Sequence, residues 1–160
     1  MEVYLLRHGD AEPAPEGGSD TERSLTGIGR HDVRRVVSAA KIAHVCPSLI
    51  LSSPYKRALE TAQLAADLLD YKGRIRTATS LVPDSSPPAL WDEIRGVRDE
   101  TCVLLAGHEP LFSAASAYLL GAPDLRIDFP KAGLIRIDLD AFPSEPHGVL
   151  RWMLSPALTI

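Results

Sequence analysis

Apolar and polar residues alternate along this chain in blocks that predict strands separated by helices. The buried strands are expected in three short apolar runs, "EVYLLR" (2–7), "SLILSS" (48–53) and "TCVLLAG" (101–107). The second of these runs is continuously apolar, as is typical of a parallel strand covered on both faces. A weaker strand is predicted at 74–81. Residues 132–140 and 148–154 flank a proline-containing loop, which indicates an antiparallel pair at one edge of the sheet.

Helical periodicity fills the intervals between these strands. The predicted helices span residues 25–45, 53–70, 90–96 and 111–121. Thr26 is a suitable cap for the first helix. In the second, Ser53 is expected to cap and Pro54 to occupy the first helical position, while Gly121 closes the last. The buried face of the first helix is predicted to comprise Val33, Val36, Val37 and Ala40.

The alternation of strands and helices predicts an α/β fold, a mostly parallel central sheet with an antiparallel edge and helices on both faces. The 160 residues suit one domain, 1–160, with a core of ordinary size. Hydrophobic residues make up 45% and charged residues 24%, as in soluble globular proteins. No apolar run is long enough to span a bilayer and no signal peptide is recognisable, so we expect a cytoplasmic location.

Charge and cysteine content exclude several classes of partner. The formal net charge of −4 argues against broad nucleic-acid binding and against binding to an anionic membrane surface. Any anion site must therefore rest on a local cluster of positive charge. Cys46 and Cys102 fit no metal-ligand spacing, and we interpret Cys102, inside a predicted strand, as a small core residue.

Basic side chains follow three of the predicted strands. Arg7 and His8 come at the end of the first, Arg57 lies in the first helical turn after the second, and His108 follows a later one. Ligands of open parallel sheets bind beyond the carboxyl ends of the strands, so these side chains are expected to meet if the strands are neighbours. Arginine forks and a helix N-terminus suit a dianion, of which phosphate is the commonest.

Each of these residues also has an ordinary structural interpretation. An arginine at a helix start is usually solvated, and a single histidine after a strand is more often structural than catalytic. The matching topological positions favour function. A neutral histidine can attack phosphorus, and a second can donate a hydrogen bond to the transferring group. Gly9, next to His8, would let a backbone carbonyl approach the ring and fix its tautomer.

Four motifs carry a family resemblance: "LLRHGDAE", "RSLTGIGR", "SSPYKRALETAQLAA" and "LLAGHEP". They resemble the strand-end RHG, the LT-x-x-G, the SP-x-x-RA-x-x-TA and the GH of the histidine phosphatase superfamily. Within it the chain most resembles the small SixA-type phosphohistidine phosphatases, on account of its length, the segment "PKAGLIRIDL" and the closing "RWMLSPALTI". The resemblance covers nearly the whole chain.

The resemblance implies a set of roles. His8 would be the nucleophile, Arg7 and Arg57 would clamp the phosphoryl group, and His108 would complete the pocket. It also implies a three-layer, phosphoglycerate mutase-like sandwich with no metal and no organic cofactor. Ser19 and Asp20 fall near residues that the family places beside the active site, although a role in covering a helix start is the alternative.

One departure from the family concerns the proton donor. Mutases and many phosphomonoesterases of the superfamily carry an acid after the third strand, commonly in Leu-x-Glu, where this chain has Pro83. Asp84 is adjacent and either donates a proton or belongs to a turn; Glu109, beside His108, is the other candidate acid. An alkoxide leaving group needs a proton donor, whereas the imidazole of phosphohistidine leaves with little help.

The sequence therefore predicts a phosphatase acting on phosphohistidine carried by a protein, through a phosphorylated His8. The expected partners are a phosphotransfer or histidine kinase domain and phosphate or another oxyanion in the pocket, with no nucleic acid and no membrane. The short loops suggest an open cleft that a protein substrate could enter. Two alternatives stay open: a broad small-molecule phosphomonoesterase, and a non-catalytic phosphate or phosphopeptide sensor.

Overall fold

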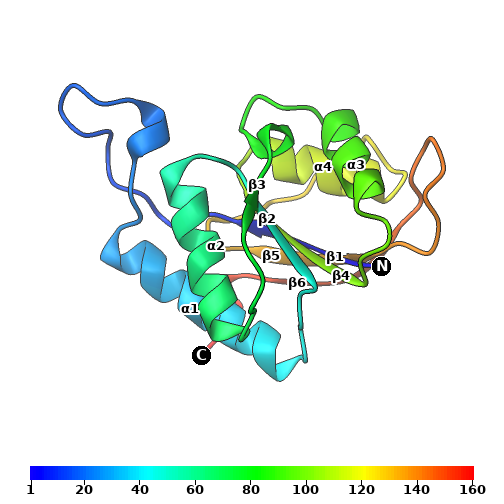
Figure 1. Ribbon diagram of the computed structural model, residues 1–160, viewed down its shortest axis with the longest axis horizontal. Coiled ribbons are helices and arrows are strands. Elements are labelled where there is room, and N and C mark those ends of the chain that lie inside the picture. Colours follow the sequence, from blue (N-terminus) through cyan, green and yellow to red (C-terminus); the bar gives the residue numbers. More distant parts are fainter.

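The chain folds around one six-stranded sheet in the computed structural model, which describes residues 1–160 (Figure 1). The strands are β1 (Glu2–Arg7), β2 (Leu49–Ser52), β3 (Arg76–Thr77), β4 (Cys102–Gly107), β5 (Leu134–Asp138) and β6 (Val149–Leu154). They lie in the order β3-β2-β4-β1-β5-β6. The first four in that order run parallel, whereas β5 is antiparallel to both β1 and β6. The predicted α/β class and antiparallel edge are confirmed.

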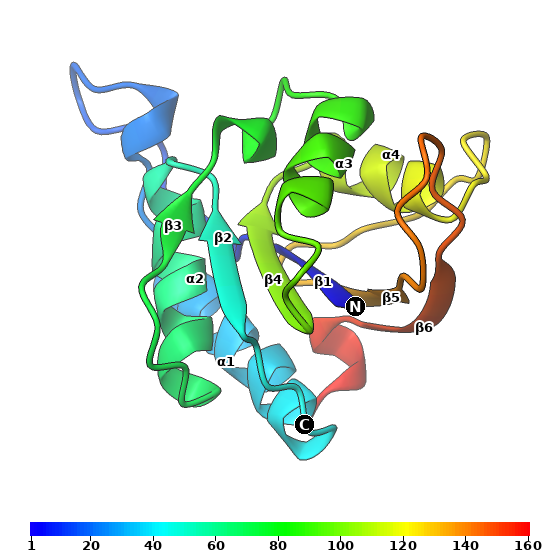
Figure 2. The ribbon, with the colours of Figure 1, turned by 45° about the vertical axis from the view of Figure 1, so that its right-hand side comes forward.

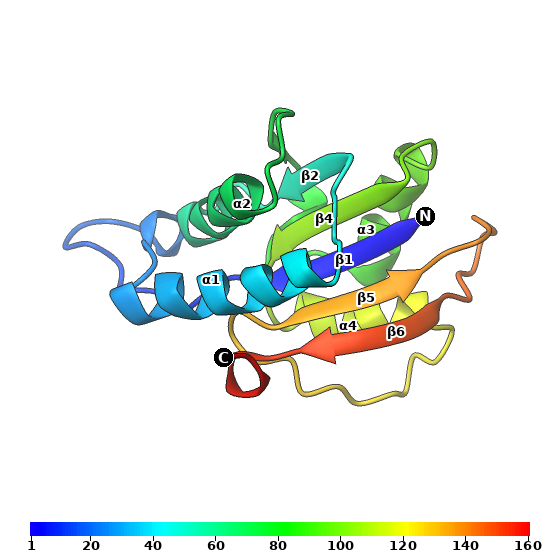
Figure 3. The ribbon, with the colours of Figure 1, turned by 90° about the horizontal axis from the view of Figure 1, so that it is seen from below.

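Four α-helices cover the two faces of the sheet and make the three layers of the fold. They are α1 (Gly27–Ile42), α2 (Lys56–Leu68), α3 (Pro87–Gly96) and α4 (Leu111–Leu119). Helices α1 and α2 cover one face, and α3 and α4 cover the other (Figures 2 and 3). Short 3-10 turns at Asp20–Glu22, Thr79–Leu81 and Pro156–Leu158 complete the fold. None of the helices has the length and apolar character needed to cross a membrane.

The side chains of β1 contribute to a hydrophobic core on each face of the sheet. Val3 and Leu5 point into the core formed with α3 and α4, while Tyr4 and Leu6 point into the core formed with α1 and α2. This is the period-2 alternation of a strand, and all four are essentially inaccessible to solvent. The apolar face predicted for α1 is buried as expected, and Thr26 caps that helix by accepting a hydrogen bond from the Gly29 amide.

The register of the parallel strands places the functional ends together. Arg7 at the end of β1 pairs with Gly107 at the end of β4, and Ser52 at the end of β2 pairs with Ala106. Because β4 lies between β1 and β2, the residues that follow these three strands emerge side by side at one edge of the sheet.

The predicted start of the second helix is wrong. Ser53 and Pro54 precede α2, which begins at Lys56 after Tyr55 in an extended conformation. The reason is that Ser53 is fully buried and its hydroxyl lies 2.8 Å from Nε2 of His108, so it serves a histidine rather than a helix end.

Two further boundaries differ from the prediction. Helix α3 begins at Pro87 instead of residue 90, because the Ser86 hydroxyl accepts a hydrogen bond from the Ala89 amide and caps it. Strand β3 is only two residues long, and both are exposed at the sheet edge. The chain then turns into the 3-10 segment Thr79–Leu81, which buries Leu81 in the core.

Candidate active site

Four basic side chains meet where β1, β2 and β4 end. Arg7 closes β1 and is followed by His8, Arg57 is the second residue of α2, and His108 directly follows β4. His8, Arg57 and His108 expose only 8%, 5% and 1% of their surfaces. The two imidazole rings lie 5.0 Å apart between centroids, and Nε of Arg57 is 3.2 Å from Nε2 of His8. The structure therefore brings together the residues that the sequence singled out.

The hydrogen bonds of His8 define its tautomer. Its Nδ1 lies 2.7 Å from the carbonyl oxygen of Gly9, which can only accept, so Nδ1 carries the proton. Arg57 donates from Nε to the other ring nitrogen, Nε2, which is therefore unprotonated and accepts this bond with its lone pair. Burial, with the nearby charges of Arg57 and Arg7, lowers the pKa of His8 to about 4. The ring is consequently neutral near pH 7.

Close backbone packing explains the glycine after His8. A Cβ atom on Gly9 would lie 2.5 Å from the carbonyl oxygen of Gly29, at the start of α1. A Cβ atom on Gly29 would in turn overlap the backbone of Asp10. The Thr61 hydroxyl accepts from the Gly9 amide at 3.3 Å and donates to the Arg57 carbonyl at 2.7 Å. The RHG segment is thus fixed against both α1 and α2.

Arg57 is held by Asp20 as well as by His8. Its Nη1 donates to the Asp20 carbonyl oxygen at 2.8 Å, and its Nη2 to the Asp20 carboxylate at 3.0 Å. Burial opposes ionisation of Asp20, but hydrogen bonds from Arg23 and Arg57 lower the pKa of this carboxyl group. Asp20 therefore contacts Arg57, one of the four basic residues. Ser19 is exposed and bonds to its own loop, to Thr21 and Glu22, without touching the four basic residues.

Two buried polar atoms of this cluster lack a partner. They are Nε of Arg7 and Nδ1 of His108. The Ser53 hydroxyl accepts from the Tyr55 amide and lies 2.8 Å from Nε2 of His108; when the hydroxyl donates its proton to Nε2, Nδ1 of His108 carries the proton of the ring. Both unpartnered atoms are then donors, and buried donors without acceptors are costly. An oxyanion bound beside His8 would supply those acceptors.

Burial lowers the pKa of two basic residues of the site, His108 and Arg7, and neighbouring carboxylates oppose this effect. Burial, with His8 and Arg57 nearby, lowers the pKa of His108 to about 3, so this ring is also neutral. Arg7 donates from Nη1 to the Phe129 carbonyl oxygen at 2.6 Å. Burial lowers the pKa of Arg7, and the negative charges of Glu109 and Asp128 oppose that effect.

Neither candidate acid contacts the four basic residues through a hydrogen bond. Asp84 is exposed on the loop before α3 and makes no hydrogen bond in the protein. Glu109 accepts from the Ser113 amide at 2.7 Å and from the Ser113 hydroxyl at 2.6 Å, so both of its oxygens cap α4. Nothing in these contacts assigns a proton donor to the site.

The sequence did not assign Ser53 or Tyr55 to the site, although both contact its basic residues. Ser53 orients His108, and the ring of Tyr55 lies against both His108 and Arg57. Lys131 reaches Asp10 with 2.5 Å between Nζ and Oδ1, and its charge adds to the lowering of the His8 pKa. The signal for Ser53 and Tyr55 was their place inside the SP-x-x-RA motif, beside the arginine it contains.

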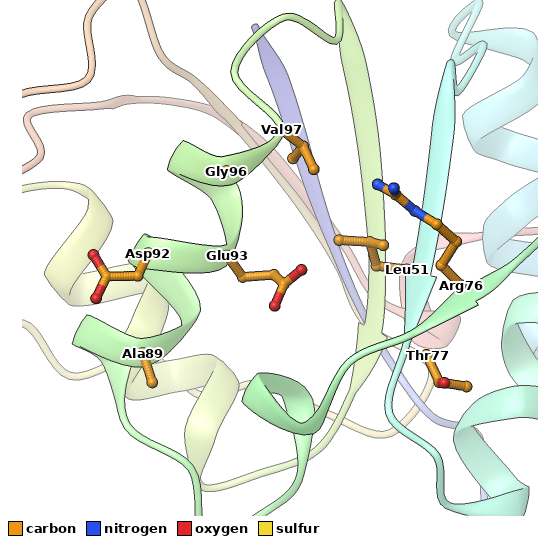
Figure 4. Close-up of a pocket in the computed structure, with 8 residues that line it drawn as sticks. All are labelled: Leu51, Arg76, Thr77, Ala89, Asp92, Glu93, Gly96 and Val97. Atoms are coloured by element: carbon orange, nitrogen blue, oxygen red, sulfur yellow. The ribbon is translucent and has the colours of Figure 1, made fainter.

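One pocket of the protein lies away from these residues. It measures about 580 Å³ and lies between β3 and α3, where Leu51 forms the floor and Arg76 and Glu93 face each other from opposite walls (Figure 4). None of the four basic residues lines it. No three side chains among His, Cys, Asp and Glu form a group that could hold a metal ion.

The fold and the paired histidines define a class of protein. The family model of the histidine phosphatase superfamily (branch 1) matches residues 3–80, which contain the RHG and the SP-x-x-RA segments. Over these residues the chain is similar to the histidine phosphatase superfamily, and it is a phosphatase.

Individual proteins show in more detail what the chain is similar to. The chain is 27% identical to the phosphohistidine phosphatase SixA of Escherichia coli K12 over 158 residues, which are 98% of this chain and 94% of the relative. A solved structure of the protein histidine phosphatase SixA complexed with tungstate matches it with a TM-score of 0.89 and 25% identity, over 98% of each chain. A mycobacterial glucosyl-3-phosphoglycerate phosphatase with inorganic phosphate shares the fold, with a TM-score of 0.69 and 19% identity over 99% of each chain.

Proposed function

We propose that this phosphatase removes the phosphoryl group from phosphohistidine carried by another protein, through a covalent phosphohistidine on its own His8. The observation that carries the proposal is the tautomer of His8, with Nδ1 donating to Gly9 and the lone pair on Nε2 beside Arg57. The similarity to SixA phosphohistidine phosphatases supports the same substrate class.

In the first step, Nε2 of His8 attacks phosphorus in line with the bond to be broken. A bond forms between Nε2 and phosphorus, while the bond from phosphorus to the substrate imidazole breaks and its electron pair returns to that ring. If the other nitrogen of the substrate ring is protonated, the ring leaves as neutral imidazole. Arg7, Arg57 and His108 donate hydrogen bonds to the equatorial oxygens, where negative charge is concentrated.

In the second step, water attacks the phosphorylated His8. The bond from phosphorus to Nε2 breaks, its electron pair returns to the ring, and the proton of the water is released with inorganic phosphate. The hydrogen bond from Nδ1 to the Gly9 carbonyl keeps the ring in one orientation through both steps. Gly9 thus acts through its backbone, and Asp20 acts by holding Arg57.

Phosphohistidine is favoured over alcohol phosphates because no acid is in place to protonate an alkoxide. Pro83 stands where a glutamate would be expected, Asp84 is exposed, and Glu109 is bonded to Ser113. Loss of such a donor typically costs about 10²- to 10⁴-fold in rate. A histidine-containing phosphotransfer domain is the kind of protein that would present phosphohistidine on an accessible helix surface.

The covalent intermediate can be trapped directly. A phosphotransfer domain carrying ³²P-phosphohistidine is mixed with the protein, quenched within milliseconds in base, and the label on the phosphatase is located. We expect acid-labile, base-stable label on His8, and turnover in His8→Ala below about 0.1% of wild type with tungstate binding partly retained. His31→Ala, an exposed histidine outside the cluster, is the matched control.

Two results would contradict the proposal. One is normal turnover by His8→Ala, which would remove His8 from the reaction. The other is hydrolysis of simple alkyl phosphates as efficient as that of phosphohistidine, which would require a proton donor and favour a general phosphomonoesterase.

A further inference from the structure

Tyr55 places an aromatic ring between two residues of the phosphoryl site. Its ring lies 5.0 Å from the ring of His108 in an edge-on arrangement, with 65° between the planes. The guanidinium carbon of Arg57 lies 5.1 Å from the centre of the same ring. Apart from the two histidines, no other aromatic ring pairs with a ring of this cluster. Tyr55 is therefore the aromatic wall of the site.

Tyr55 is more accessible to solvent than the two site residues that its ring contacts. It is only half-buried, whereas His8, Arg57 and His108 are buried. Its hydroxyl has no hydrogen-bond partner in the protein, while its amide donates to the Ser53 hydroxyl at 3.3 Å and fixes the backbone. The ring thus has a set position and a solvent-facing part.

In-line attack determines where the leaving group lies. His8 approaches phosphorus from the buried side, so the group that leaves must be on the opposite, open side. A group leaving there passes the rim on which Tyr55 stands beside Arg57 and His108. Aromatic rings attract one another through edge-to-face or offset contacts, and an imidazole ring can make such a contact where an alkyl group or an amine cannot.

We propose that Tyr55 is a specificity-determining residue whose ring packs against the imidazole of the phosphohistidine being cleaved. The inference rests on the proposed function and names the part of the substrate that the protein recognises beyond the phosphoryl group. Contacts between aromatic rings are worth about 2- to 10-fold in relative rate or affinity. Tyr55 would accordingly make the enzyme prefer substrates whose leaving nitrogen belongs to an aromatic ring. The four basic residues bind the phosphoryl group itself.

The test compares two substrates with the same bond to phosphorus. In N-phosphoimidazole the leaving nitrogen is part of an aromatic ring, whereas in phosphoramidate the leaving nitrogen carries only hydrogens. The measured quantity is the ratio of kcat/KM for the two in wild type, Tyr55→Leu and Tyr55→Phe. We expect Tyr55→Leu to lower this ratio by about 2- to 10-fold, and Tyr55→Phe to keep the wild-type ratio because the ring is retained. Lys56→Ala, at an exposed neighbouring position, should also keep it.

The outcomes separate this inference from the function on which it rests. If wild type hydrolyses N-phosphoimidazole but Tyr55→Leu slows both substrates equally, Tyr55 only supports Arg57 and His108, and the inference is overturned. A fall of the kcat/KM ratio in Tyr55→Phe would assign the selectivity to the hydroxyl group and would also overturn the inference. If wild type does not hydrolyse N-phosphoimidazole or a phosphorylated protein, the proposed function fails first. Unchanged tungstate binding in Tyr55→Leu verifies that the site is still formed.

Discussion

Lowering the pH from about 7.5 to about 5.5 is expected to destabilise the folded protein through His8 and His108. Burial lowers the pKa of His8 to about 4 and that of His108 to about 3, from an ordinary value of 6.5. The unfolded chain therefore binds more protons than the folded protein once the pH falls below about 6.5. The contribution of both rings to stability is complete above that pH and is lost as the pH falls toward the folded values.

The size of the loss follows from the protonation of the two states. At pH 5.5 an unfolded histidine is about 90% protonated, whereas the buried rings are still neutral. Relative to pH 7.5, this difference amounts to about 1.35 kcal/mol for each histidine, or about 2.7 kcal/mol for the pair. The result hardly depends on the folded values, because both pKa values lie more than one unit below 5.5. The site carboxyl groups Asp10 and Asp20 have pKa values below 3.8 and do not titrate in this range.

Urea unfolding at the two pH values measures this loss as a change in the free energy of unfolding. The buffers must be free of phosphate, because an anion that binds only the folded protein would add its own stabilisation. The double variant His8→Gln/His108→Gln lacks both groups and should lose less than about 0.5 kcal/mol between the two pH values. His31→Gln, which replaces an exposed histidine, should lose as much as wild type.

A wild-type loss of less than about 1 kcal/mol would refute the reasoning, because it would mean that the buried rings accept protons as readily as free histidine. An equal loss in the double variant would refute it as well, since the acid-sensitive groups would then lie outside the site.

Activity should follow the neutral form of His8, whose pKa is about 4: kcat/KM for phosphate release should stay level from pH 7 to about 5 and fall about tenfold per pH unit below about 4. Gly29→Ala should lower the free energy of unfolding by at least about 2 kcal/mol, because its Cβ would overlap the Asp10 backbone, whereas Gly27→Ala, with nothing within 4 Å, should be neutral or stabilising in the same urea titration. Thr61→Val should cost about 1–3 kcal/mol by removing both hydrogen bonds of the hydroxyl, and Thr61→Ser should restore most of it.

The fold could be predicted from the sequence wherever one physical rule dominates. The run Leu49–Ser52 is entirely buried, as a strand covered on both faces must be, and α1 buries the face that its periodicity indicates. The prediction failed where a side chain had a long-range partner. Ser53 looked like a helix cap because its partner, His108, is 55 residues away. A cap is a local contact, and sequence patterns register only local contacts.

The membership of the site could be predicted because parallel strands end at one edge, and Arg7, His8, Arg57 and His108 all follow strand ends. Its internal arrangement could not. No spacing rule indicates that Asp20, in the exposed 3-10 turn, accepts hydrogen bonds from both terminal nitrogens of Arg57. Nor does one indicate that the ring of Tyr55 lies against both Arg57 and His108. These contacts depend on how loops pack around the sheet edge, which the order of strands determines.

That strand order also governs when the chain can acquire its activity during synthesis. Strand β4 lies between β1 and β2, so the two earliest strands have no direct pairing with each other. His8 follows β1 and Arg57 follows β2, and these two strands are held in one sheet by β4, residues 102–107, which pairs with both. A ribosome must therefore complete roughly two thirds of the 160 residues before the histidine pair exists. A nascent chain that ends before β4 therefore lacks both the strand that joins β1 to β2 and the second histidine of the site.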